Sequence, residues 1–239
     1  MIDSCKTLFT FDIDGTILNC LDGKEVRLNA FLSAYQKFFN TNKFLSKKDL
    51  FGKLTIGMTD AATAQSILNK HQGHSSPKEI YDFLQFYNES FIHSNMNKPV
   101  LTNGIREIVN EIKKCKNTFV CLASGATFET AKYRISYVEV SDLFVPFIGG
   151  FGDNLKRKDC IREAIREAHN YTRSNISCVI HIGDTNDDIE SALKVNAIPI
   201  GVKTGMIRYK QDHYSNYFFN DLIQAKDKIM SIIASNSCK

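Results

Sequence analysis

Two acidic side chains near the start of the chain have the spacing to bind a metal ion or a phosphoryl group. Residues 11–16 read FDIDGT, so Asp12 and Asp14 stand at alternate positions directly after an apolar run. If that run is a strand of an open α/β sheet, reactive groups lie beyond its carboxyl end, where both carboxylates can converge on one cation or substrate. Gly15 permits a tight turn there. The alternative interpretation is a turn whose acids only cap a helix.

A second acidic segment follows another apolar run. Residues 183–188 read GDTNDD, which places Asp184, Asp187 and Asp188 within five positions and before a helical pattern. Oxygen ligands of this kind suit Mg²⁺, which proteins hold with a few carboxylates, waters and substrate oxygens. Acids also gather at helix N-termini because of the helix dipole. The acid pair at Asp12 and Asp14 favours the metal-site interpretation.

Two further segments carry groups that bind phosphate. Ser124 and Gly125 follow a third apolar run, and a hydroxyl with backbone N–H groups at such a place can bind phosphoryl oxygens. Taken alone, this pair is typical of a simple cap or turn. The basic run 156–158 precedes a helical pattern, and a cation beside the acids would neutralise a phosphoryl dianion. Without such neighbours it would be an ordinary surface run.

The elements that must position these groups alternate between strand and helix. The apolar runs rich in β-branched and aromatic residues predict buried parallel strands over 7–13, 118–123, 178–182 and 197–202. Helical patterns lie between and after them, one beginning near Asn103 as a capping residue and one capped by Asp221. This alternation predicts an α/β fold with a doubly wound parallel sheet.

One region breaks the alternation. From about Leu18 to Pro99 the sequence contains no convincing strand, and helical patterns cover 26–39, 61–71 and 76–95. An all-helical unit is therefore expected as an insertion after the first strand.

Composition excludes several classes of protein. The 239 residues carry a net charge of +4 with no concentrated Lys/Arg block, so a nucleic-acid-binding protein is not expected. No apolar stretch is long enough for a membrane span, and the first apolar run is cut at Asp12, which makes a poor signal peptide. The seven cysteines are scattered without a CxxC pair. Reduced thiols and a cytoplasmic location are therefore expected.

The four segments, in this order at predicted strand ends, resemble the motifs of the haloacid dehalogenase superfamily, most of whose members are phosphatases. The resemblance extends from Thr7 to about Gly205. It implies a Rossmann-like parallel-sheet core over 1–17 and 100–239, with an all-helical cap domain over 18–99 inserted between the first and second motifs. The segment between Ser124 and Arg157 is too short to hold another cap.

The resemblance also implies roles for the acids. Asp12 would be the nucleophile that forms an aspartyl-phosphate, and Asp14 the general acid and then the base. Mg²⁺ would be bound by Asp12, by the backbone carbonyl of Asp14 and by Asp184, directly or through water. Asp188 would support the metal, and Asp187 is a less favoured alternative.

The phosphate-binding roles implied by the resemblance fall on the remaining motifs. Ser124 and Gly125 would bind the transferring phosphoryl group, and Thr16 would order the first loop. The basic residue of the third motif is Arg157 or Lys158. Arg157 is favoured because apolar residues follow it at the helical spacing typical of the family.

Residues in the cap would select the substrate. Residues 57–60 read GMTD, and a similar turn occurs in the caps of phosphoglycolate-phosphatase-like proteins. We therefore expect Thr59 and Asp60 to face the substrate, with Lys53 as a further candidate. The alternative is that Thr59 and Asp60 only cap the helix 61–71. A carboxylate at position 60 would favour sugar or polyol phosphates over phosphoglycolate.

Together these features predict a Mg²⁺-dependent phosphatase that hydrolyses a small phosphorylated metabolite. Asp14 favours phosphoester chemistry, because the family's dehalogenases and phosphonatases lack an acid at that position. The alternatives are a phosphomutase of the β-phosphoglucomutase type and a non-catalytic phosphate-binding protein. We expect no nucleic-acid or membrane partner, and a monomer or homodimer.

Overall fold

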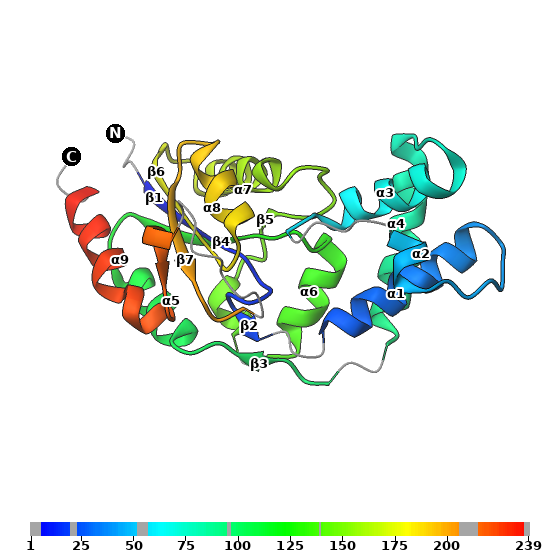
Figure 1. Ribbon diagram of the computed structural model, residues 1–239. Helices are drawn as coiled ribbons and strands as arrows, with labels where there is room; N and C mark the ends of the chain where they lie inside the picture. Colours follow the sequence, from blue (N-terminus) through cyan, green and yellow to red (C-terminus); the bar gives the residue numbers. More distant parts are fainter. Residues whose placement is uncertain are drawn as a thin grey trace.

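The computed structural model describes residues 6–19, 23–51, 57–94, 97–138, 140–205 and 215–236. A six-stranded parallel sheet forms the centre of the larger part of the molecule (Figure 1). In spatial order its strands are β5 (Gly149–Gly150), β4 (Thr118–Ala123), β1 (Lys6–Phe11), β6 (Ile176–Gly183), β7 (Ile198–Val202) and β8 (Phe218–Phe219). The predicted parallel α/β sheet is therefore confirmed.

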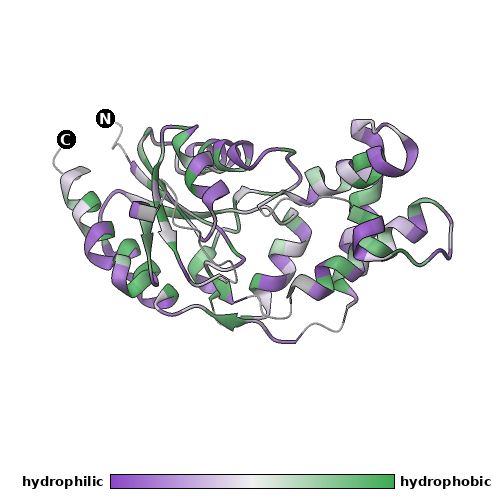
Figure 2. Ribbon diagram, viewed as in Figure 1, coloured by the Kyte–Doolittle hydropathy of each residue, from purple (hydrophilic) through white to green (hydrophobic). Residues whose placement is uncertain are grey.

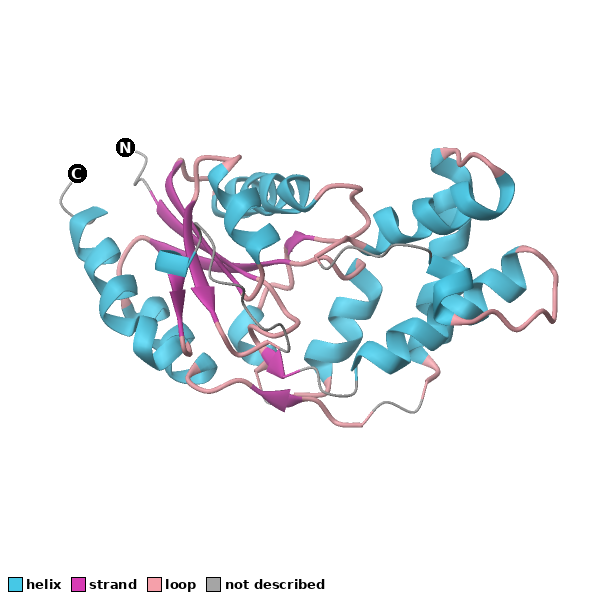
Figure 3. Cartoon of the chain, viewed as in Figure 1, coloured by secondary structure: helices cyan, strands magenta, loops and turns pink. Residues whose placement is uncertain are grey.

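Helices cover both faces of this sheet (Figure 3). Successive residues of β1 point to opposite faces, so Phe9 and Phe11 enter one apolar cluster and Leu8 enters another. The first cluster is completed by α5 (Ile105–Lys114), α6 (Phe128–Ser136) and α9 (Leu222–Asn236). The second is completed by α7 (Arg157–Thr172) and α8 (Asn186–Leu193). Burial on both faces explains why β1, β4, β6 and β7 are mostly apolar (Figure 2).

The order of the strands fixes where a ligand can bind. From β1 the chain passes first to β4 and β5 on one side, and then to β6, β7 and β8 on the other. In open α/β sheets the crevice lies beyond the carboxyl ends of the strands, at the point where this order reverses. The loops after β1, β4 and β6 meet there.

Within the described residues, four helices make up a second part of the molecule, which we call the helical unit. They are α1 (Gly23–Phe38), α2 (Lys47–Phe51), α3 (Asp60–Gln72) and α4 (Pro77–Ile92). The unit has its own apolar cluster, in which Phe31 stacks on Tyr87 with 4.1 Å between ring centroids. Ser76 begins α4 with a reciprocal capping box to Glu79.

The chain enters and leaves the helical unit side by side. β2 (Leu18–Asn19) pairs antiparallel with β3 (Val100–Leu101), so that Leu18 lies opposite Leu101. The expectation that the stretch from Leu18 to Pro99 has no strand is wrong at its first two residues. β2 is only two residues long and is held by pairing with a distant segment, so no periodicity marks it in the sequence.

One predicted helix cap is also wrong. Gly104, at φ 84°, is the N-cap of α5, whereas the side chain of Asn103 donates a hydrogen bond to Asp221 Oδ2 at 2.8 Å. A Cβ on Gly104 would lie 2.7 Å from Ile223 Cδ1, so close packing on α9 requires glycine at this point. Asp221 caps α9 as predicted, because its Oδ1 accepts from the backbone N–H of Gln224 at 2.9 Å.

Several expectations concern residues outside the described ranges, namely Cys5, Cys20, Lys53 and Cys238. The four described cysteines form no disulfide. No helix within the described ranges is long and apolar enough to cross a membrane.

Candidate active site

The loop after β1 brings Asp12 to the centre of the sheet edge. The backbone N–H of Asp12 donates to Ile182 O at 2.9 Å, and its side chain is buried. Gly15 adopts φ 76° in the turn that follows. A Cβ on Gly15 would lie 2.2 Å from Asp184 Oδ2, so the loop can approach this acid only because residue 15 is glycine.

Three buried acids form a cluster at this edge. Carboxylate oxygens of Asp12, Asp184 and Asp188 all lie within 4.8 Å of one another. Burial, opposed by Arg157, raises the pKa of Asp12 to about 6. Burial and the neighbouring charges of Asp12 and Asp188 raise the pKa of Asp184 well above its usual value. This crowding of negative charge is what a bound cation relieves.

The donor set fits a hard divalent cation. Among the described residues, Asp12 Oδ1 is buried and accepts no well-aligned hydrogen bond, and its charged neighbour there is Arg157 in an ion pair. Asp184 lies against the glycine-lined turn at Gly15 and Gly205, where neither residue carries a side chain that would obstruct a ligand. Carboxylate oxygens of this kind are the ligands that Mg²⁺ prefers. The predicted metal residues Asp12, Asp184 and Asp188 are therefore brought together.

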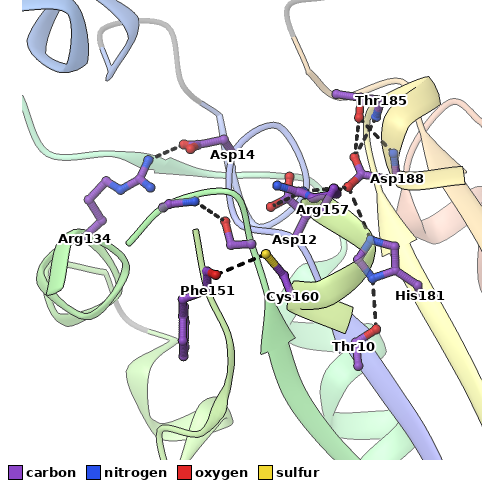
Figure 4. Close-up of polar contacts among 12 residues, drawn as sticks. Thr10, Asp12, Asp14, Arg134, Phe151, Arg157, Cys160, His181, Thr185 and Asp188 are labelled. Atoms are coloured by element: carbon purple, nitrogen blue, oxygen red, sulfur yellow. Dashed lines mark hydrogen bonds and ion pairs between the residues drawn. The ribbon is translucent and has the colours of Figure 1, made fainter. Parts of the chain in front are cut away.

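Arg157 bridges two acids of this cluster, Asp12 and Asp188 (Figure 4). Its Nη2 lies 2.7 Å from Asp12 Oδ1 and 2.6 Å from Asp188 Oδ1, and its Nε donates to Asp188 Oδ1 at 2.9 Å. Within the described part of the chain, Lys158 makes no contact with these acids. The start of α7 therefore directs Arg157 to the acids, and the choice of Arg157 as the functional basic residue stays a prediction.

Asp188 lies among several hydrogen-bond donors. Its Oδ2 accepts from the backbone N–H and the hydroxyl of Thr185, at 3.0 and 2.6 Å. Its Oδ1 also lies 3.3 Å from His181 Nε2, while Thr10 Oγ1 lies 2.9 Å from His181 Nδ1. Burial would raise the pKa of Asp188, but Arg157, His181 and Thr185 lower it well below its usual value. Asp188 therefore stays ionised and holds Arg157.

Asp187 points to a different neighbour. Gly57 of the helical unit, at φ 92°, approaches so closely that a Cβ on it would lie 2.0 Å from Asp187 Oδ2. Asp188, not Asp187, shares the acidic cluster.

The second motif lies beside Arg157. The backbone N–H of Ser124 continues the sheet by donating to Gly150 O at 3.0 Å, and its buried hydroxyl accepts from Ala126 N–H at 3.3 Å. A Cβ on Gly125 would lie 2.5 Å from Arg157 Nη1. Thr16 is fully buried in the first loop, and its Oγ1 has no hydrogen-bond partner among the described residues.

The two residues expected to face substrate are engaged in contacts within the protein. Thr59 Oγ1 accepts from Ala62 N–H at 3.1 Å as the N-cap of α3. Asp60 Oδ1 accepts from Arg27 Nε at 2.8 Å, and its Oδ2 accepts from Thr127 N–H at 3.1 Å. Contact of Thr59 and Asp60 with a substrate stays a prediction.

Two arginines of this region were missed by sequence reasoning. Arg27 of α1 pairs with Asp60, and Arg134 of α6 pairs with Asp14 (Figure 4). Each occupies the inward face of its helix: Arg27 precedes Phe31 by four residues, and Arg134 adjoins the buried Ile135. A charged residue on an apolar helical face was the signal that could have drawn attention to them.

Comparison with solved structures shows the same fold. A predicted phosphatase from Clostridium acetobutylicum is 19% identical, with a TM-score of 0.65 over 95% of this chain and 100% of that one. CbbY from Rhodobacter sphaeroides, solved with phosphate, is 15% identical, with a TM-score of 0.62 over 93% and 96% of the two chains. A second CbbY structure, of a variant, holds xylulose-(1,5)-bisphosphate, with 15% identity and a TM-score of 0.61 over 91% and 95%.

The comparison with curated proteins found no match. The sequence profile of the haloacid dehalogenase-like hydrolases, in contrast, matches residues 9–202, which include every motif of the site. The resemblance inferred from the motifs is therefore confirmed, and with it the expectation of a hydrolase. The chain belongs to the haloacid dehalogenase-like hydrolases.

Proposed function

We propose that this hydrolase is a Mg²⁺-dependent phosphatase that acts on a small phosphorylated metabolite through an aspartyl-phosphate on Asp12. The observation that carries the proposal is the position of Arg157, whose Nη2 lies within 2.7 Å of both Asp12 and Asp188 inside a buried acidic cluster. A carboxylate attacks a phosphate dianion only where positive charge offsets their repulsion. The structures of similar fold that hold phosphate or a sugar bisphosphate agree with this substrate class.

The acidic cluster suggests which residues would hold the metal ion. Asp12 and Asp184, with the backbone carbonyl of Asp14, would hold the ion, while Asp188 would contribute charge through Arg157. When bound, the ion neutralises the phosphoryl oxygens and lowers the repulsion at Asp12.

The residues of the chain divide the chemistry between them. A carboxylate oxygen of Asp12 forms a bond to phosphorus while the bond to the leaving oxygen breaks and Asp14 gives that oxygen a proton. Asp14 then takes a proton from water, whose oxygen attacks phosphorus and releases Asp12. Ser124, the backbone at Gly125 and Arg157 orient the phosphoryl oxygens, as groups placed beforehand for the transition state.

The helical unit would act as the cap over this site, with 18–99 as cap domain and 1–17 and 100–239 as core. Contacts at Gly57 and Asp60 place the unit directly against the core loops. A hinge motion of the helical unit at the paired strands β2 and β3 would open the site to substrate, and the return motion would exclude water.

An assay of purified protein tests the proposed function. Release of inorganic phosphate is measured across a panel of small phosphorylated metabolites, with Mg²⁺ and with EDTA. We expect turnover with Mg²⁺, none in EDTA, and a drop to near background in Asp12→Asn. Asp142→Asn, at an acid that is 67% exposed, is the matched control and should keep wild-type turnover.

Other outcomes would overturn the proposal. Undiminished activity in metal-free protein would exclude the metal role, and wild-type turnover in Asp12→Asn would exclude the covalent route. Conversion of a phosphoester into its isomer, without phosphate release, would identify a phosphomutase. Phosphate binding without turnover of any substrate would identify a binding protein.

A further inference from the structure

Arg134 joins a core helix to the loop that carries Asp14. Its Nη1 forms a hydrogen bond and ion pair with Asp14 Oδ1 (Figure 4). The side chain of Arg134 is only 6% exposed, whereas that of Asp14 is 40% exposed. The buried partner is thus the arginine, and the carboxylate at the edge of the site is the group that it anchors.

Arg134 is itself held in place. Its Nε donates to Thr130 O, one turn back in α6, at 3.4 Å. Its guanidinium carbon lies 5.6 Å above the ring of Phe91, at the end of α4 in the helical unit. The guanidinium is therefore fixed by its own helix on one side and by an aromatic face on the other, which makes it a rigid support.

A rigid support of this kind fixes the direction of a carboxylate. Asp14 follows β1 in a loop, and its side chain is too exposed for packing alone to select one rotamer. A charge-assisted bond to Oδ1 sets the plane of the carboxylate, and with it the direction of Oδ2. General acid–base catalysis depends on this direction, because proton transfer needs hydrogen-bond geometry to the leaving oxygen.

The arginine of the third motif does not fill this role. Arg157 contacts Asp12 and Asp188, whereas Arg134 contacts Asp14 (Figure 4). Arg134 and Arg157, as the described residues show them, are therefore buried arginines with separate carboxylate partners.

We propose that Arg134 is a positioning residue for Asp14, which it holds in the orientation needed for proton transfer at the leaving-group oxygen. The proposal rests on the proposed function, in which Asp14 is the acid and base. Phe91 extends this support into the helical unit, so the position of Asp14 depends on a residue of that unit.

A comparison of two leaving groups tests this role. The ratio kcat/KM is measured for an alkyl phosphate, glycerol phosphate, and for p-nitrophenyl phosphate, in wild type, Arg134→Gln and Arg134→Lys. An alkoxide leaving group needs a proton from the acid, whereas nitrophenolate does not. The ratio kcat/KM reports the steps up to and including the first irreversible step, in which the leaving group departs. We expect Arg134→Gln to lose roughly tenfold or more with glycerol phosphate and less than about twofold with p-nitrophenyl phosphate.

The variant Arg134→Lys distinguishes the positioning of Asp14 from a general effect on folding. Lysine keeps the charge and the ion pair but lacks the planar fork, so an intermediate loss restricted to the alkyl substrate is expected. Arg166→Gln, at an arginine that is 64% exposed, is the matched control and should resemble wild type. In an Asp14→Asn background, Arg134→Gln should cause no further loss, because both changes remove the same function.

Other results would reject the positioning role of Arg134. Equal losses with both substrates, or an undiminished loss in the Asp14→Asn background, would show that Arg134 only supports the fold or binds phosphate. Wild-type values for both Arg134 variants, in an active enzyme, would reject the positioning role while the proposed function stands. Absence of turnover in the wild type with both substrates and across the metabolite panel would reject the proposed function, and the role of Arg134 with it.

Discussion

Asp60 Oδ2 accepts a hydrogen bond from the backbone N–H of Thr127 at 3.1 Å, and this contact joins the first residue of α3 to the N-cap of α6. The other oxygen of Asp60 accepts from Arg27 Nε at 2.8 Å. One buried carboxylate thus links two helices of the helical unit to the core. Its charge is paired with that of Arg27 inside the protein, and the expected preference for sugar or polyol phosphates over phosphoglycolate stays a prediction.

Asp60→Ala is therefore expected to change stability as well as specificity. The change leaves Arg27 without its carboxylate and the N–H of Thr127 without its acceptor, so the free energy of unfolding should fall by about 1–3 kcal/mol. Thr59→Ala, which removes only a helix cap, should cost about 1 kcal/mol. Urea unfolding of both variants measures these losses. A neutral Asp60→Ala that changes only the substrate preference would show that Asp60 faces the ligand.

Gly57→Ala should disturb the seating of the helical unit on the core. A Cβ at this position would lie 2.0 Å from Asp187 Oδ2, in addition to the strain of φ 92°. Gly73→Ala is a matched control, because Gly73 has φ 88° but no atom within 4 Å of its added Cβ. We expect the control to lose about 1 kcal/mol of stability from strain alone, and Gly57→Ala to lose more as well as turnover. Equal losses in thermal unfolding would mean that the contact with Asp187 has no effect.

Asp12→Asn should stabilise the metal-free protein in a pH-dependent manner. The pKa of Asp12 rises from 3.8 to about 6 on folding, so the folded state binds more protons between these values and its stability falls as pH rises through them. The variant should therefore match wild type near pH 4 and exceed it near pH 7.5, by up to about 3 kcal/mol.

Thermal unfolding in EDTA at both pH values checks this expectation. Mg²⁺ should then raise the melting temperature of wild type near pH 7.5 and that of Asp12→Asn much less. A variant less stable than wild type near pH 7.5 in EDTA would contradict the expected cost of the buried charge.

Arg157 and Lys158 are neighbours in sequence and should differ sharply in function. Arg157→Ala removes the partner of Asp12 and Asp188, which lies within 2.7 Å of both, and should lower kcat/KM by at least about a hundredfold. Lys158→Ala removes a side chain without a contact to these acids in the described structure and should change kcat/KM by less than about twofold. Reversed effects in steady-state kinetics would reassign the third motif.

The parts of the fold that the sequence predicts are those with a local cause. β1, β4, β6 and β7 are mostly apolar because helices cover both sheet faces, and this is visible in each run of the sequence. The apolar spacing after residue 157, compared with that typical of the family, likewise favours Arg157 over Lys158. β5 and β8 were missed because each has only two residues, which is too short for any periodicity.

The contacts that were missed depend on partners far away in the chain. Arg27 pairs with Asp60 across 33 positions, and Arg134 pairs with Asp14 across 120. Each arginine looks like a surface residue of a helix until the fold places an acid beside it. Periodicity can mark such a residue as lying on a buried face, but only the tertiary structure identifies its partner.

The paired crossings at β2 and β3 make the insertion a replaceable module. Beside them, the backbone N–H of Thr102 donates to Ile17 O at 3.0 Å, so the core is already closed at the point where the chain departs and returns. A short loop could span this junction, and a different set of helices could be grafted onto it, without moving Asp12 or the strands behind it. A unit exchanged in this way would have to supply anew the contacts that the present helices make with the core, such as that of Phe91 with Arg134.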